Sequence, residues 1–190
     1  MRVARHVLAL LLAIWAGTAA AQVTTPEALY HGVLTVNPAR GTLDLVTGNA
    51  LLKAGHWRAD LNPETNGMFP DREPILFAIG EEIFRLPDDM MRSSRKGKMF
   101  SYRAKPAPER GIGSLRLQRR RNGSWSITFD LRGVELSALF VDNPVCKPLA
   151  LIVGDDDFFN GVLLSRAPPA STHLRIPSDC DATGGWPWIR

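Results

Sequence analysis

The 190-residue chain has few of the residues that most often carry catalysis or bind metals. It contains two cysteines and four histidines, and none of them are spaced like the ligands of a zinc site. The G-x-S-x-G motif of serine hydrolases, the P-loop and the dinucleotide-binding fingerprint are also missing. The sequence therefore predicts no catalytic residue, no cofactor and no metal site of a familiar kind, and an enzyme is the less favoured interpretation.

Long apolar runs are also scarce, and the one at the N-terminus predicts export. Arg2 and Arg5 precede an uncharged apolar run, residues 7–15, and Ala19-Ala20-Ala21 fits the small-x-small pattern of signal-peptide cleavage. The alternative is a membrane anchor, but the run is shorter than the roughly 20 apolar residues that a spanning helix needs. We expect residues 1–21 to be a signal peptide. The protein would then be periplasmic or secreted, with no transmembrane segment after cleavage.

Acidic residues are nearly absent from residues 92–121. This segment holds 11 Lys or Arg residues and one acid, Glu109, while the rest of the chain after residue 21 holds 10 basic and 18 acidic residues. Such a segment attracts anionic polymers or surfaces. The side chains expected to do so are Arg95, Lys96, Lys98, Arg116, Arg119, Arg120 and Arg121. The alternative is a solvated linker and sheet edge, where charge opposes aggregation.

Most of the chain after residue 21 consists of short apolar runs separated by turns. Apolar and polar residues alternate in residues 32–36, 42–46 and 124–131, as half-buried strands require. The 14 prolines and 16 glycines disfavour long helices, and one short helix is expected near residues 134–140. The sequence predicts an all-β fold, a sandwich or a barrel-like pair of sheets. Its expected core includes Leu34, Val36, Leu43, Leu45, Trp57, Leu61, Leu76, Ile79, Phe84, Leu115, Leu117, Trp125, Ile127, Phe129, Leu149, Leu151, Val153 and Phe159.

The two halves of this region resemble each other. A Leu-x-Leu strand, a Trp-led alternating strand and a Pro-led apolar run that ends in Gly and acids recur in the same order. They lie at residues 43–45, 57–61 and 74–84, and again at residues 115–117, 125–129 and 148–159. We therefore predict one β-domain over residues 22–166, built from two repeats of about 70 residues, residues 30–91 and 98–166. This pattern resembles repeats in exported bacterial proteins with no assigned activity, a resemblance that implies a β-architecture and no chemistry.

The two cysteines, Cys146 and Cys180, are predicted to form a disulfide, because exported proteins retain disulfides. The alternatives are two free thiols or half of a metal site. A bridge would close a loop of about 34 residues and hold the Pro- and Gly-rich tail, residues 167–190, against the domain. The apolar residues 186–189 are expected to dock on the domain as well, or else to bind a partner.

Three consecutive acids, Asp155, Asp156 and Asp157, are the weak candidates for metal ligands, because carboxylates bind Ca²⁺. Glu81 and Glu82 occupy the matching place in the first repeat. Consecutive residues of a strand point to opposite faces, so the three acids cannot converge unless the chain turns there. We therefore favour a hairpin turn at this point over a metal site.

The sequence leaves three hypotheses about function. The first is an exported, non-enzymatic β-domain that acts as a structural or interaction module for an unknown ligand. The second is a binder of an anionic polymer or surface through residues 92–121. The third is a hydrolase of an unrecognised type that uses Asp or Glu residues. The partner is not identified, and an anionic polymer or another protein fits the composition.

Overall fold

Twelve β-strands make up most of the computed structural model, which describes residues 30–37, 39–94, 96–142, 144–166, 172–176 and 180. The signal-peptide prediction for residues 1–21, the basic Arg95 and the apolar residues 186–189 lie outside the described residues. The strands are β1 (Tyr30–Thr35), β2 (Ala39–Leu43), β3 (Asn49–Asp60), β4 (Ile75–Ile79), β5 (Glu82–Leu86), β6 (Arg92–Ser94), β7 (Met99–Arg103), β8 (Gly111–Arg119), β9 (Trp125–Glu135), β10 (Val145–Val153), β11 (Asp156–Arg166) and β12 (His173–Ile176).

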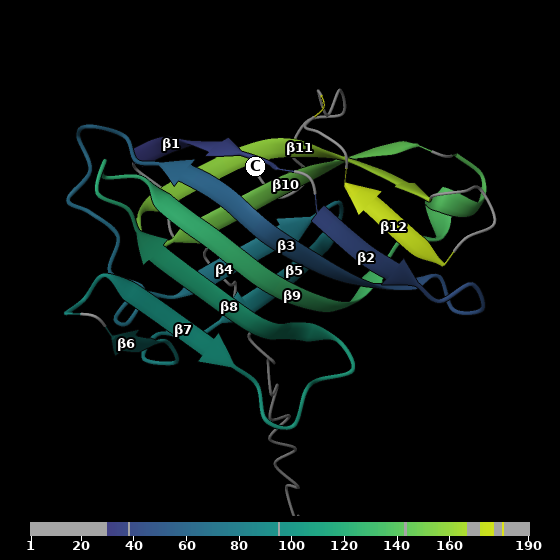
Figure 1. Cartoon of the computed structure of the whole chain (residues 1–190), viewed down its shortest axis with the longest axis horizontal. Coiled ribbons are helices and arrows are strands. Elements are labelled where there is room, and N and C mark those ends of the chain that lie inside the picture. Colours follow the sequence, from purple (N-terminus) through teal and green to yellow (C-terminus); the bar gives the residue numbers. More distant parts are fainter. Residues whose placement is uncertain are drawn as a thin grey trace, which may run out of the picture.

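The strands form one 12-stranded sheet that folds into two crossing layers, called the front sheet and the back sheet (Figure 1). The front sheet has the order β3-β9-β8-β7-β6, and the back sheet has the order β11-β10-β4-β5. β11 and β3 are linked near one end by β1, which pairs with both, and near the other end by β12 and β2. This ring closes one side of the molecule, and the end strands of the order are β5 and β6. The all-β, barrel-like fold expected from the sequence is therefore present.

The core lies between the facing sheets, where alternate strand residues point inward. Trp57, Phe77 and Phe129 form its aromatic centre, with ring centroids 4.7 Å apart for Trp57 and Phe129 and 4.6 Å apart for Phe77 and Phe129. Leu117 and Ile127 are fully buried beside them. Apolar burial on this scale stabilises the fold by about 1.5–3 kcal/mol for each large side chain.

Four residues of the expected core are not buried. Leu45 is 42% exposed, because β2 ends at Leu43 and the chain turns at residues 44–47. Leu61, Leu76 and Phe159 are only half-buried. In β4 and β11 the inward positions belong to their neighbours, and the buried residues there include Phe77 and Phe158. Apolar runs without alternation do not show which set of positions faces inward, which explains these errors.

The three acids fall at a hairpin turn, as the sequence predicted. Gly154 and Asp155 form the two-residue turn between β10 and β11, and Gly80 and Glu81 form the equivalent turn between β4 and β5. Both glycines have a positive φ, +61° at Gly80 and +59° at Gly154, which glycine adopts without strain. The two Pro-led runs of the sequence therefore fold into the same local structure.

Strands that correspond in the two halves pair with each other. Arg58 of β3 faces Ser126 of β9, and the same offset of 68 residues matches Trp57 to Trp125. Phe77 of β4 faces Leu151 of β10, and the same offset of 74 residues matches Gly80 to Gly154. Antiparallel pairing of a residue with its own counterpart is the arrangement that an internal two-fold axis would produce. The duplication itself stays a prediction.

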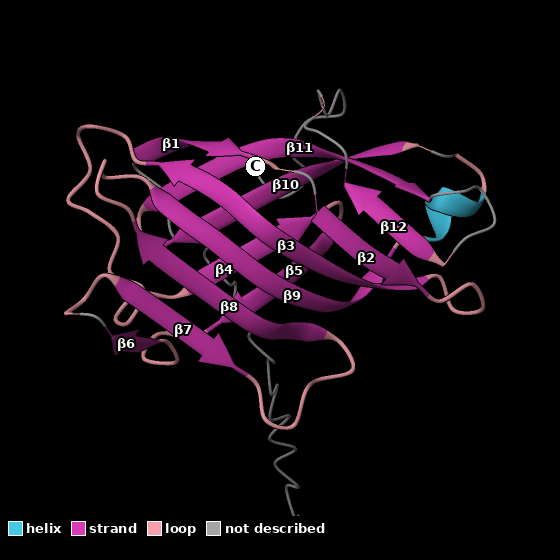
Figure 2. Cartoon of the chain, viewed as in Figure 1, coloured by secondary structure: helices cyan, strands magenta, loops and turns pink. Residues whose placement is uncertain are grey.

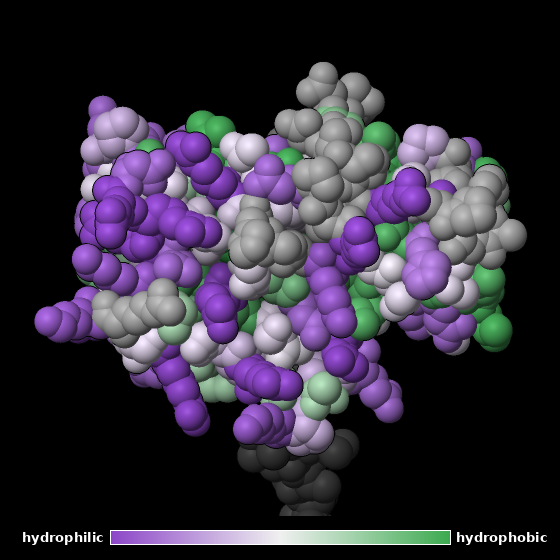
Figure 3. Space-filling view, in the orientation of Figure 1, coloured by the Kyte–Doolittle hydropathy of each residue, from purple (hydrophilic) through white to green (hydrophobic). Residues whose placement is uncertain are grey.

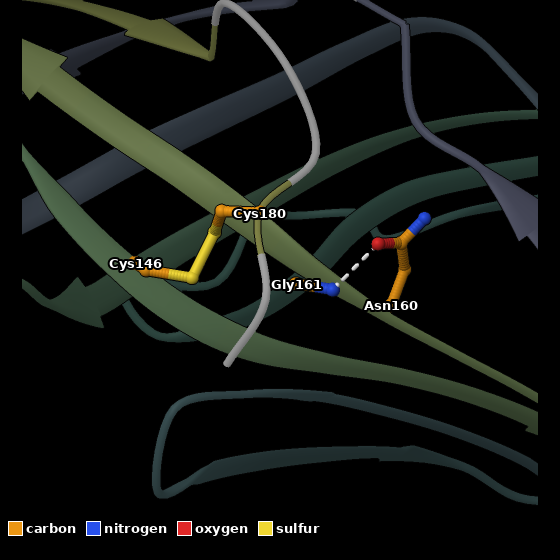
Figure 4. The surroundings of a disulfide bond; sticks show 4 residues. All are labelled: Cys146, Asn160, Gly161 and Cys180. Atoms are coloured by element: carbon orange, nitrogen blue, oxygen red, sulfur yellow. Dashed lines mark hydrogen bonds between the residues drawn. A yellow bond between two sulfur atoms is a disulfide. The ribbon is translucent and has the colours of Figure 1, made fainter. Parts of the chain in front are cut away.

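The segment predicted to be a docked tail, residues 167–190, contains the strand β12. β12 pairs with β11 on one side and with β2 on the other, so it belongs to the ring that closes the fold. Cys146 of β10 and Cys180 form the predicted disulfide, with Cα atoms 6.1 Å apart (Figure 4). The Cys180 N–H donates a hydrogen bond of 3.2 Å to the Gly161 carbonyl. Because Gly161 has no side chain, Cys180 can approach β11 this closely.

The expected short helix is a single 3-10 turn, η1 (Ser137–Phe140), which Figure 2 shows beside the ring. Val134, placed in the helix by the sequence, still belongs to β9. No helical segment among the described residues has the length and hydropathy of a membrane span.

Candidate functional site

A groove of about 1270 Å³ lies on the side of the molecule away from the closing ring. β5 and the loop after it form one wall, and β6, β7, the β7–β8 loop and β8 form the other. Residues of β9, from Thr128 to Arg132, complete the lining. We call this feature the basic groove, because basic side chains outnumber acidic ones around it.

Seven basic and two acidic side chains line the basic groove. The acidic ones are Asp89 and Asp130, and the basic ones are Arg85, Arg92, Arg103, Lys105, Arg110, Arg116 and Arg132. All seven basic residues except the half-buried Arg132 are exposed. Like charges that share a concave surface raise the local positive potential, so the groove attracts anions.

The register of the front sheet brings these side chains together. Arg92, Ser101 and Arg116 lie side by side on β6, β7 and β8, and their side chains lie on the face opposite the buried Leu115 and Leu117. Because neighbouring strands are about 4.8 Å apart, the backbones of Arg92 and Arg116 are about 10 Å apart. Anionic groups at a similar spacing would reach both guanidinium groups.

A β-bulge at Gly113 lies in the lining of the groove. The register between β8 and β9 shifts between Ile112 and Ser114, which leaves Gly113 as the extra residue. A Cβ atom at Gly113 would lie 3.3 Å from both Arg132 Nε and Asp130 Oδ2, so these side chains lie over the glycine. Arg132 Nη2 and Asp130 Oδ2 are 3.8 Å apart. Arg132 Nε and Asp130 Oδ1 are buried without a hydrogen-bond partner among the described residues.

Most of the basic side chains of the groove have no acidic partner. Arg110 forms an ion pair with Glu82 of β5, and Arg132 lies near Asp130. In the described part of the chain, no ion pair involves Arg85, Arg92, Arg103, Lys105 or Arg116. Among the described residues, five of the basic residues that line the groove therefore form no internal ion pair.

The structure separates the predicted anion-binding residues into two groups. Arg116 lines the groove. Five others form what we call the tip cluster, at the adjacent β6–β7 and β8–β9 turns: Lys96, Lys98, Arg119, Arg120 and Arg121. The Arg119 N–H donates a 2.9 Å hydrogen bond to the Lys98 carbonyl, which joins the two turns. Hydrophilic side chains gather over this left-hand end in Figure 3. All five side chains of the tip cluster are exposed.

The sequence did not identify most of the groove. Arg92, Arg103, Lys105 and Arg110 belong to the basic segment but were not singled out, and Arg85 and Arg132 lie outside that segment. The one signal available was alternation, which places Arg103 and Arg116 opposite the apolar face of their strands. Contiguous charge in residues 119–121 is easier to see, although it marks a turn rather than the concave surface.

The three acids at the β10–β11 turn do not converge. His31 Nδ1 hydrogen-bonds to Asp157, with its two carboxylate oxygens at 2.7 and 2.9 Å. Asp156 lies on the other face of β11, which it shares with Phe158 of the core, and is 1% exposed. Asp155 lies in the turn itself, where its Oδ2 accepts a 3.0 Å hydrogen bond from Asn66.

Burial has a clear electrostatic effect on this acidic region. Desolvation raises the pKa of Asp156 and of Glu73, whose carboxyl group packs against Gly154. The neighbouring charge of Asp155 raises both pKa values further, and Thr65 lowers that of Asp156 in part. Within the described residues, no three His, Cys, Asp or Glu side chains are placed to share a metal ion.

The histidines after residue 21 lie apart in the strand order. His31, His56 and His173 lie on β1, β3 and β12, three different strands. Neither His31 nor His173 is among the residues that line the basic groove. Among the described residues, the groove is therefore the candidate site with the clearest chemical character, which is an excess of positive charge.

Comparison with known proteins adds no further assignment. No protein-family model matches the chain, and neither the curated proteins nor the solved structures contain a match to it. The function must therefore be argued from the residues of the groove.

Proposed function

We propose that this protein is a non-enzymatic interaction module that binds an anionic polymer through the basic groove. The observation that supports the proposal is the lining of the groove, which has seven basic and two acidic residues; five of the seven have no ion-pair partner within the described residues. Electrostatic attraction into a concave surface provides affinity without a specific pocket, as polyanion binding requires.

The alternative is that the charge only keeps a sheet edge soluble. That role would be served by scattered Lys residues, but the register places Arg92 of β6 and Arg116 of β8 on either side of Ser101 of β7. Arginine is the side chain that pairs best with phosphate, sulfate and carboxylate groups, because its planar fork donates two parallel hydrogen bonds. Six of the seven basic residues of the groove are arginines.

The acids with raised pKa values favour binding over hydrolysis as well. Shifted carboxylates are often found at catalytic sites. Asp156 and Glu73, however, lie at the β10–β11 turn and neither of them lines the groove. Asp156 is also too deeply buried to reach a polymeric substrate, since only 1% of it is exposed.

Export is part of the proposal. It depends on the signal-peptide pattern of residues 1–21, and the Cys146–Cys180 disulfide is compatible with it because disulfides persist in oxidising compartments. An exported protein meets acidic polysaccharides rather than genomic nucleic acid. Fractionation of cells that express the full chain would test this point, with periplasmic or secreted material lacking residues 1–21 as the expected result.

The binding proposal is tested by removing three uncompensated arginines of the groove. We expect the variant Arg92→Gln, Arg103→Gln, Arg116→Gln to bind fluorescent heparin at least about tenfold more weakly than the wild type in anisotropy titrations. A control with the same change in charge is Arg40→Gln, Arg72→Gln, Arg175→Gln, which alters three exposed arginines outside the groove. Equal losses in the two variants would show that net charge, not the groove, governs binding.

A further inference from the structure

We infer that the ligand is a linear acidic polysaccharide that runs along β8, from the basic groove to the tip cluster. This inference depends on the proposed function and adds the ligand's chemical class and its path. Four observations support it: the spread of basic residues along β8 from end to end, the burial of the nearby aromatic rings, the position of the exposed apolar residues, and a hairpin turn that forms without arginine.

The first observation is the continuity of charge along β8. The β7–β8 loop, with Lys105 and Arg110, precedes this strand; Arg119 ends it, and Arg120 and Arg121 follow it. Arg116 projects from the strand between them. β8 has nine residues, so its two ends, one at the β7–β8 loop and the other at the tip cluster, are about 26 Å apart, and Arg116 lies three residues before Arg119. One small anion cannot touch both ends, whereas a polymer with a charge on each repeat can.

The second observation concerns stacking. Proteins that bind single-stranded nucleic acid stack its bases on exposed aromatic side chains. The rings nearest the tip cluster are Phe100 and Trp125, which are 5% and 3% exposed and pack against each other at 5.9 Å. Tyr102, in the groove, is half-buried and packs against the core. Among the described residues, the surface around the tip cluster and the groove thus presents charge and no exposed aromatic ring on which bases could stack.

The third observation concerns apolar contacts. The most exposed apolar side chains are Val46 and Val141, at 93% and 86%, in the β2–β3 turn and directly after η1. Both lie at the far end of β9 from the tip cluster, because Asn49 pairs with Glu135 and Ala59 with Trp125. A bilayer bound through both charge and apolar contact would need these features on one side. A hydrophilic polymer needs only the basic side.

The basic residues are also not demanded by the fold. The β2–β3 turn and the β8–β9 turn each join two antiparallel strands that are neighbours in the sheet. The first contains Asp44, Leu45, Val46 and Thr47 and no base, whereas the second contains Arg120 and Arg121. A hairpin turn in this sheet therefore forms without arginine. The fold does not require the arginines of the tip cluster, and they can bind a ligand.

The test compares ligands of different length on the full exported chain. We would titrate the wild type with a heparin tetrasaccharide, a heparin hexadecasaccharide and single-stranded DNA of the same contour length as the hexadecasaccharide. The tip variant is Lys98→Gln, Arg119→Gln, Arg120→Gln, Arg121→Gln, and thermal unfolding checks that it keeps its fold. We expect it to lose at least tenfold in affinity for the long oligosaccharide and less than twofold for the short one.

The outcomes separate this inference from the proposed function. An equal loss for the long and the short oligosaccharide, or no loss for either, would overturn the path along β8. DNA that binds as tightly as the long oligosaccharide would overturn the polysaccharide class, while the effect of the groove variant would still support a polyanion groove. Absence of heparin binding by the wild type would overturn the proposed function itself.

Discussion

Asp156 is a buried acidic residue, and its replacement makes a quantitative test. The residue is 1% exposed, and a side-chain hydrogen bond with Thr65 offsets only part of the effect of burial on its pKa. Desolvation, with the nearby charges of Asp155 and Asp157, raises its pKa above the ordinary value of 3.8. Each unit by which a pKa is raised costs about 1.4 kcal/mol of stability at a pH where the unfolded carboxyl is ionised.

The sign of the pH dependence follows from the raised pKa. The folded state keeps its proton to a higher pH than the unfolded state does. The associated stabilisation is therefore fully present below about pH 4 and is lost as the pH rises through the folded-state pKa. We expect the variant Asp156→Asn, which is neutral and of similar size, to be more stable than the wild type at pH 7 by about 1 to 3 kcal/mol. At pH 3.5 the two proteins should differ by less.

Urea unfolding followed by tryptophan fluorescence at several pH values measures this difference. Trp57 and Trp125 are buried, so their emission reports on loss of the core. The exposed Asp88→Asn is the matched control and should leave both the stability and its pH dependence unchanged. If Asp156→Asn lowers the stability at pH 7 as much as at pH 3.5, the carboxylate is satisfied in the native state and the reasoning is wrong.

Two further predictions concern the stability of the fold. Replacing both cysteines, Cys146→Ser and Cys180→Ser, should lower the free energy of unfolding by about 3 to 4 kcal/mol, because the bridge closes a long loop in the unfolded chain. Equilibrium denaturation of the variant, compared with the wild type with and without reductant, measures this; an unchanged midpoint would contradict it. Leu117→Ala, at a fully buried site, should cost about 2 to 5 kcal/mol, whereas Leu45→Ala, at a turn residue, should cost less than about 1 kcal/mol. Equal losses in thermal unfolding would place Leu45 in the core after all.

The fold was largely accessible from the sequence, because its signals are local. Alternation in residues 124–131 predicted β9, and Gly154 with its acids predicted the β10–β11 turn. The presence of two cysteines in a chain with an expected signal peptide predicted the disulfide between Cys146 and Cys180. Burial of individual residues in continuous apolar runs was less accessible, as Leu76 and Phe77 illustrate, since a shift by one position exchanges the two faces of a strand.

The groove was not accessible from the sequence, because long-range register creates it. Arg85, Arg103 and Arg132 lie on β5, β7 and β9, and only the order of strands brings them to one concave surface. The conspicuous run of residues 119–121 instead lies at a turn. β12 was missed for a similar reason: four residues in a Pro-rich tail show too little alternation, and their pairing with β11 and β2 is what makes them a strand.

The central claim is that the basic groove binds a polyanion, and the salt dependence of heparin binding tests it most directly. Binding that releases counterions weakens linearly in log–log plots as salt increases, with a slope set by the number of ionic contacts. The account predicts that the variant Arg92→Gln, Arg103→Gln, Arg116→Gln reduces the steepness of this slope by about two to three. The control Arg40→Gln, Arg72→Gln, Arg175→Gln should keep the wild-type slope, and identical slopes for all three proteins would contradict the account.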